Sequence, residues 1–297
     1  MYNLLSANIY RILKSLVFKL GVLFSGGMAA FAVVARFFDI KKFPDLYEKL
    51  DPTYSNVDGL LFVGALYTAF VTAIFVALFI GTEYSDGTLR NKIMAGHKRT
   101  SIYLANLIVC MIANILFALI YVVVAYVLGA LLLGGTSFTV TQIILFILIC
   151  IIAISTIASI MLMLAVFLSN KAMAGIVLLL TAMFMLIATM TINSKLEAPK
   201  YRYYYIEEDE KIFVDIDKLS EKEKEETDII TEQNRRYVAG TKRKIYEEVL
   251  AMLPVNQIYG VINADVKTPI KTLTYDTLLI IVSTVFGIVV FKRKDLK

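Results

Sequence analysis

The chain has 297 residues, of which 58% are hydrophobic and only 19% are charged. Soluble domains carry roughly 25% charged residues, so this composition excludes an ordinary soluble domain and indicates an integral membrane protein. The net charge is +5, and we expect no nucleic-acid partner. Both cysteines, Cys110 and Cys150, lie in apolar runs, so no disulfide framework or metal-ligand spacing is predicted.

The first 14 residues are predicted to form an interfacial elbow helix. Apolar residues recur there at helical spacing, with polar residues between them, as in helices that lie in the membrane surface. The alternative is that this stretch is the fraying start of the first span.

Six apolar runs predict six transmembrane helices, because about 20 apolar residues cover the hydrocarbon core. The run that starts at Ile102 continues to Leu133, more than one crossing needs, before Gly134-Gly135 ends it. A lysine at the centre of a span costs about 2.5–3.5 kcal/mol, so Ser169-Asn170-Lys171 is predicted to be a surface hairpin. Within 15–192 the first five spans are 16–38, 60–80, 102–128, 140–168 and 172–192, and the sixth is 273–291.

Two of the spans carry small residues four positions apart, which make a flat strip where another helix can approach closely. We expect these strips to serve helix packing or dimerisation, although alanine is common in membrane helices. They are Gly21, Ser25 and Ala29 in the first span, and Ala65, Ala69, Ala73 and Ala77 in the second.

Residues 193–276 are more polar and predict an extracellular α+β insertion between the fifth and sixth helices. We expect strands at 201–206 and 211–216 and a highly charged segment at 218–226. An amphipathic helix is expected at 241–253, with Ile245, Val249, Met252 and Leu253 on one face and Pro254 as its end. The predicted fold is therefore an all-α integral membrane protein with one small mixed domain.

The distribution of Lys and Arg predicts the orientation, because these residues mark the cytoplasmic side. Segments 1–20, 81–101, 169–171 and 292–297 fall on one side and hold 12 basic and 3 acidic residues. The loop at 36–59, on the other side, holds 4 basic and 5 acidic residues. We therefore expect a multi-pass plasma-membrane protein with both termini cytoplasmic, including the 292–297 tail.

The polar segment 81–99 stands between the second and third spans. Asp86-Gly87 is a turn dipeptide, Thr88 is expected to cap a helix over 89–95, and Gly96 is expected to end it. A helix this short is marginal in water, so it must rest against something. The segment is either a solvated basic loop or a docking helix for a partner protein.

The chain lacks the residues of several chemistries. No GxxxxGK[ST] phosphate loop is present, so we expect no bound nucleotide or other cofactor in this chain. The spans lack ionisable residues between their ends, which argues against ion coupling. Their polar side chains serve either helix–helix contact or substrate contact, and the main ones are Asn106, Asn114, Gln142, Ser155, Thr156 and Ser159.

The string Glu83-Tyr84-x-x-Gly87-Thr88-x-Arg90-Asn91, directly after the second span, resembles the permease subunits of type-2 ABC (ATP-binding-cassette) transporters. The resemblance covers 1–192 and 270–297. The string that starts at Tyr237-Val238-x-Gly240-Thr241, followed by Pro254-x-x-Gln257, resembles permeases of this family from Gram-positive bacteria. The large domain before the last span departs from the short link with re-entrant helices of many members.

The resemblance implies an exporter permease that is not itself an enzyme. Its coupling helix would sit in a cleft of a separate ATPase subunit, which would bind the ATP and Mg²⁺. The other implied partners are a second permease copy or a homologous permease, and the lipid bilayer. An amphipathic or peptide-like compound is the implied cargo. The implied coupling residues are Glu83, Tyr84, Asp86, Gly87, Thr88, Leu89, Arg90, Asn91, Lys92 and Ile93. The alternative is a membrane-anchored receptor or sensor whose outer domain binds a ligand.

Overall fold

The computed structural model describes residues 1–49, 56–168, 170–207, 210–214, 229–266 and 268–294. Within these ranges six helical stretches are long and apolar enough to cross a membrane, which confirms the predicted number of spans. They are α2 (Leu16–Lys42), α5 with α6 (Asp58–Leu61 and Val63–Ser85), α8 (Arg99–Leu132), α9 (Val140–Leu168), α10 (Lys171–Leu196) and α14 (Pro269–Arg293).

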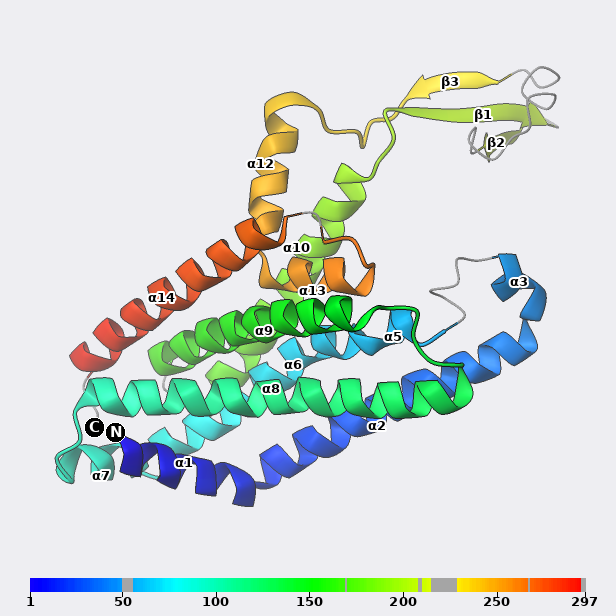
Figure 1. The fold of residues 1–297 in the computed structure, drawn as a ribbon. Coiled ribbons are helices and arrows are strands. Elements are labelled where there is room, and N and C mark those ends of the chain that lie inside the picture. The colour runs from blue at the N-terminus through cyan, green and yellow to red at the C-terminus, as the bar shows by residue number, and fades with distance from the viewer. Residues whose placement is uncertain (50–55, 169, 208–209, 215–228, 267, 295–297) are drawn as a thin grey trace. The chain divides into compact units, whose positions relative to one another are not determined.

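The remaining helices are short. They are α1 (Tyr2–Lys14), α3 (Pro44–Lys49), α7 (Thr88–Met94), α12 (Gly240–Ala251) and α13 (Pro254–Ile262). The chain divides into two compact units, one of residues 1–186 with 251–297 and one of residues 187–250. In the first unit, α1, α7 and the end of α14 gather at the same end of the helices (Figure 1).

Most spanning helices continue beyond the predicted apolar runs, because a helix ends at a turn or a breaker and not where polarity begins. The helix α2 runs to Lys42, just before Pro44, and α6 runs to Ser85, just before the Asp86-Gly87 turn. The 34-residue α8 ends before Gly134-Gly135, both of which have a φ of +90°. The helix α14 begins at Pro269, four residues before the predicted start of the sixth span at 273, since proline suits the first helical turn.

The helix α8 packs against α2, α6, α9 and α14, and three of its aromatic rings lie against glycines of three different helices. A Cβ added at Gly64 of α6 would lie 2.0 Å from Cγ of Tyr121. At Gly21 of α2 the corresponding distance to the Phe117 ring is 2.7 Å. Gly287 of α14 meets Tyr103 in the same way. Glycine therefore allows the close packing of α2, α6 and α14 around α8.

Both predicted small-residue strips are buried inside this chain. Gly21, Ser25 and Ala29 lie on the face of α2 that contacts α8, and Ala65, Ala69, Ala73 and Ala77 are each at most 4% exposed. Of the two predicted roles, this burial supports packing between helices of one chain.

Polar side chains within the spans form contacts between helices, as the helix–helix interpretation predicts. Thr72 of α6 donates to Oδ1 of Asn114 of α8 at 2.8 Å, and the hydroxyls of Ser159 and Ser283 lie 2.6 Å apart. Gln142 differs, because it lies in the first turn of α9 and accepts from the backbone N–H and the hydroxyl of Thr139. That reciprocal pair is a capping box and not a contact within the membrane.

The expectation that the spans lack buried ionisable residues is wrong at three positions, Asp58 in α5, Glu83 in α6 and Asp276 in α14, which are 1%, 0% and 0% exposed. Asp58 and Glu83 lie beyond the predicted ends of the second span, and Asp276 lies close to the predicted start of the sixth; the observed helices include all three. Asp276 lies beside Thr156 and Gln257, and its carboxylate oxygens have no hydrogen bond of ordinary geometry among the described residues. Glu83 belongs to the site described below.

At the end of the first unit opposite α7, Asp58 joins the start of α5 to the loop between α8 and α9. Its carboxylate accepts hydrogen bonds from the backbone N–H of Ser137 at 3.0 Å and from the hydroxyls of Thr136 and Ser137. Asn56 donates to the same carboxylate at 2.9 Å. Because this buried acid is fully hydrogen-bonded, it ties the two loops together.

The second unit contains a three-stranded antiparallel sheet of order β2-β1-β3, with β1 (Tyr201–Glu207), β2 (Glu210–Val214) and β3 (Ile230–Gln233). The first two strands match the predicted ones to within two residues, and β3 was not predicted. The charged segment predicted at 218–226 lies outside the described residues.

The helix predicted at 241–253 forms as α12. Ile245, Val249 and Met252, from its predicted apolar face, are between 42% and 53% exposed, but the predicted role of Pro254 is wrong. Pro254 starts the next helix, α13, where proline is favoured in the first turn. The helix α13 packs against α9 and α6 of the first unit and buries Gln257 and Ile258.

Candidate functional site

The candidate site is the reversal between α6 and α8, which contains the short helix α7. Gly87 has a φ of +66°, and Gly87 itself, not Thr88, is the N-cap of α7, without a side-chain capping bond. This corrects the predicted capping role of Thr88. The helix covers Thr88–Met94, one residue earlier than predicted.

The predicted stop at Gly96 has the geometry of a Schellman motif. The N–H of Gly96 donates to the carbonyl of Ile93 at 2.9 Å, and the N–H of His97 donates to the carbonyl of Lys92 at 3.2 Å. Gly96 has a φ of +85°, a conformation that L side chains rarely adopt. Two left-handed glycines therefore set the direction in which α7 leaves α6 and enters α8.

Glu83, in the last turn of α6, is the centre of a buried polar network. Its Oε1 pairs with Nη1 of Arg11 at 2.6 Å and with the ammonium of Lys92. Its Oε2 accepts a hydrogen bond from Nδ2 of Asn106 at 2.7 Å. The network thus joins α6 to α1, α7 and α8 through one fully buried carboxylate.

Two asparagines complete the network. Asn8 of α1 donates to Oδ1 of Asn106 at 2.6 Å and accepts from Lys92 at 3.0 Å. Sequence reasoning missed Asn8 and Arg11. The signal was nonetheless present: Asn8 stands between Leu4 and Ile12 on the buried face of α1, and an asparagine there needs a hydrogen-bonding partner.

Lys92, one of the implied coupling residues, points into the protein, and its side chain is only 13% exposed. Burial lowers the pKa of the Lys92 ammonium, and the adjacent Glu83 carboxylate opposes that change. The lysine is therefore part of the support under α7 and not part of its exposed face.

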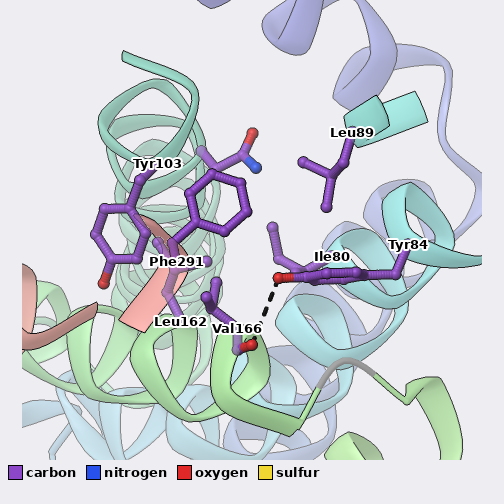
Figure 2. Close-up of a pocket in the computed structure, with 8 residues that line it drawn as sticks. Ile80, Tyr84, Leu89, Tyr103, Leu162, Val166 and Phe291 are labelled. Carbon is purple, nitrogen blue, oxygen red and sulfur yellow. Dashed lines mark hydrogen bonds between the residues drawn. The ribbon is translucent and has the colours of Figure 1, made fainter. Parts of the chain in front are cut away.

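Tyr84 of α6 and Leu89 of α7 form the apolar contact between α7 and the helices behind it. Figure 2 shows both side chains directed toward Val166 and Phe291, around a cavity of about 10 Å³. The Tyr84 hydroxyl donates to the carbonyl of Val166 at 3.4 Å, and Leu89 is 3% exposed. This volume is at the lower limit for one water molecule, so the space is a packing gap and not a ligand pocket.

The ends of α9 and α14 are held beside this site by cations that bond to their last carbonyl groups. Nη1 of Arg99 donates to the carbonyls of Phe291, Lys292 and Lys294, at 2.9, 3.0 and 2.5 Å. The Lys294 ammonium donates to the carbonyls of Val166 and Phe167, both at 2.6 Å. Positive groups at helix C-termini are favourable, because the last carbonyls there lack partners within the helix.

One side of α7 is exposed in the single chain. Arg90, Asn91 and Met94 are exposed, with Met94 at 71%, while Ile93 packs partly against the core. Asp86 is exposed in the turn before α7. We call Arg90, Asn91 and Met94 the outer face of α7. Of the predicted coupling residues, Glu83, Tyr84, Leu89 and Lys92 support this face from inside.

The described residues hold no group of three or more His, Cys, Asp or Glu side chains that would suit a metal ion. The outer face of α7 presents one basic and one apolar side chain, Arg90 and Met94, on a helix held from the other side by the Lys92–Glu83 pair.

Comparison with known families gives one finding. A family model described as ABC-2 family transporter protein matches residues 21–205, more than half of the chain. No curated protein matches this sequence.

Proposed function

Because the chain belongs to the ABC-2 family of transporter proteins and is a multi-pass membrane permease, we propose that it exports its cargo with ATP hydrolysed by a separate ATPase subunit. The cargo we propose is an amphipathic or peptide-like compound. ATP and Mg²⁺ would bind to that partner and not to this chain, and a second permease, identical or homologous, would complete the transporter.

The observation that carries this proposal is the construction of α7. The outer face of α7 is exposed, whereas on the opposite side Lys92 pairs with Glu83 of α6 and donates to Asn8 of α1, and Leu89 is buried. A helix of seven residues is not stable by itself, so its position depends on these contacts. Through the same contacts, a displacement of α7 would be transmitted to α1, α6 and α8. We propose that the ATPase subunit causes that displacement through the outer face of α7.

Gly87 provides the test. Gly87→Val is expected to reduce transport and stimulated ATP turnover at least tenfold, because a β-branched residue at a φ of +66° is strongly disfavoured and re-aims α7. Gly87→Asn is the matched control, since asparagine tolerates this conformation, and it should keep most of the activity. Nothing lies within 4 Å of a Cβ added at Gly87, so the difference reports backbone conformation and not a clash.

The measurement is ATP hydrolysis and transport by the chain copurified with its ATPase, at matched amounts in the membrane. The chain alone is expected to hydrolyse no ATP. Equal activity of Gly87→Val and Gly87→Asn would contradict the proposed coupling. Copurification without any ATPase would favour a ligand-binding receptor instead.

We propose further that both termini and α7 are cytoplasmic and that the second unit is extracellular, in the plasma membrane. Cysteine introduced at Lys200, in the second unit, should react with an impermeant thiol reagent in intact cells, and cysteine at Lys98 should not. Both positions are exposed, and the native Cys110 and Cys150 are buried and give little background. Labelling at Lys98 alone would reverse the proposed orientation.

We propose that a dimer would form through a face other than the small-residue strips, since these strips are buried in the single chain. The outward side of α2, which includes Phe24 and Phe31, is exposed in the single chain. In a membrane such a surface contacts lipid or a second permease.

A further inference from the structure

A groove of about 410 Å³ lies between α1 and the end of α6, next to the Glu83 network, with which it shares Arg11. Its rim is polar and includes Arg11, Lys14 and Thr82, and its wall is apolar and includes Val17, Leu78 and Phe79. We call this the elbow groove. A cationic rim over an apolar wall is complementary to an anionic amphiphile, that is, a molecule with a negative head and a hydrocarbon chain.

The two cations of the elbow groove are only partly neutralised. The Arg11 guanidinium lies 3.8 Å from the ring centroid of Phe79 and pairs with Glu83 through Nη1, and its side chain is still 32% exposed. The Lys14 ammonium lies 4.4 Å from the ring centroid of Tyr10, and within the described residues no carboxylate pairs with it. The rim therefore carries an excess of positive charge.

The position of the elbow groove along the helices favours a lipid over a soluble anion. The span α2 begins at Leu16 and the span α6 ends at Ser85, and the groove is lined by residues within a turn or two of both ends. Such residues lie at the level of the phospholipid headgroups, where long basic side chains meet phosphate. Leu13, Leu16 and Leu20 add exposed apolar surface next to it.

We propose that the elbow groove binds one anionic phospholipid, with its phosphate on Arg11 and Lys14 and the start of an acyl chain on Leu78 and Phe79. Nη1 of Arg11 pairs with Glu83, and Nη2 lies 3.5 Å from the carbonyl oxygen of Phe79. The guanidinium has five N–H donors, so a phosphate that accepts from the remaining N–H groups adds to the Glu83 pair without displacing it. The bound lipid thereby stabilises Arg11 in the position that Glu83 requires. This inference rests on the spanning helices and not on the proposed ATPase partner.

The test is a lipid titration of the purified full chain in mixed micelles, with bound lipid counted by native mass spectrometry. Wild type is expected to retain dioleoyl-phosphatidylglycerol in preference to dioleoyl-phosphatidylcholine. Lys14→Ala should weaken phosphatidylglycerol binding about fivefold, the effect of one basic residue near an anionic surface. Lys19→Ala is the matched control, because Lys19 is exposed five residues away and does not line the groove, and it should change binding less than twofold.

A second variant tests the apolar wall. Leu78→Trp fills the groove and leaves every charge in place, so it should also remove the bound phosphatidylglycerol. Inorganic phosphate at millimolar concentration should not displace the lipid. Equal retention of the two phospholipids, equal effects of Lys14→Ala and Lys19→Ala, or displacement by inorganic phosphate would each overturn the proposal.

Discussion

Glu83→Ala is expected to reduce stimulated ATP turnover and transport to background and to destabilise the protein by about 3–5 kcal/mol. The carboxylate is 0% exposed and pairs with two cations, Arg11 and Lys92. Its removal leaves both cations without their counter-charge, Lys92 at a largely buried position and Arg11 at a partly exposed one, and leaves the Nδ2 group of Asn106 without its acceptor. The measurements are thermal unfolding of the purified chain and ATPase rate with the partner subunit.

The matched control for this prediction is Asp86→Ala, three residues along the same reversal. Asp86 is exposed, and its side chain bonds only to the hydroxyl of Ser85 at 3.0 Å in the described structure. That substitution should change stability by less than about 0.5 kcal/mol. If Glu83→Ala and Asp86→Ala had equal effects, the Glu83 network would have no special role.

A double substitution separates stability from coupling. Combining Glu83→Gln with Lys92→Met removes one positive charge together with the carboxylate, so it should recover part of the lost stability. The connection between α6 and α7 is nevertheless absent in this variant, and we expect ATP turnover to remain low. Recovery of turnover in parallel with stability would show that Glu83 acts only through folding.

Gly64→Val is expected to prevent the native packing of α6 against α8. Even the Cβ of alanine would lie 2.0, 2.3 and 2.4 Å from Cγ, Cδ1 and Cδ2 of Tyr121, and Tyr121 is 2% exposed, with no space to turn aside. Overpacking in a core typically costs about 1–3 kcal/mol, and contact distances this short place valine at or above the upper value. The measurement is the yield of folded chain in size-exclusion chromatography, with thermal unfolding of what is recovered.

Two comparisons show whether the clash is the cause. Gly27→Ala, in α2, introduces the same methyl group with nothing within 4 Å, so it should be neutral or stabilise by up to about 1 kcal/mol. Gly64→Ala should recover when Tyr121 is also replaced with alanine, because the obstructing ring is then gone. If Gly64→Ala behaved like Gly27→Ala, α6 and α8 would have to pack less closely than the structure describes.

The sequence alone predicted the six spans, the span at 140–168 to the residue, and the polar reversal at 81–99. These features depend on local properties, namely the length of an apolar run and the positive φ that glycine permits. Gly87 and Gly96 belong to this class, since each has the left-handed conformation expected of it. Because a helix also continues through polar residues until a breaker, the same reasoning misplaced the ends of α6 and α14.

Only the tertiary structure decided which residues meet. Glu83 was recognised beside the reversal, but its partner Arg11 lies 72 positions earlier in the chain, and no local pattern indicates that pairing. From the sequence, the strip of Gly21, Ser25 and Ala29 is equally consistent with a helix contact within one chain and with a contact between two chains. The structure shows that α8 packs against this face of α2. The physical reason is the same in both cases: burial and ion pairing depend on which surfaces come together in space, whereas periodicity and turn chemistry are properties of neighbouring residues.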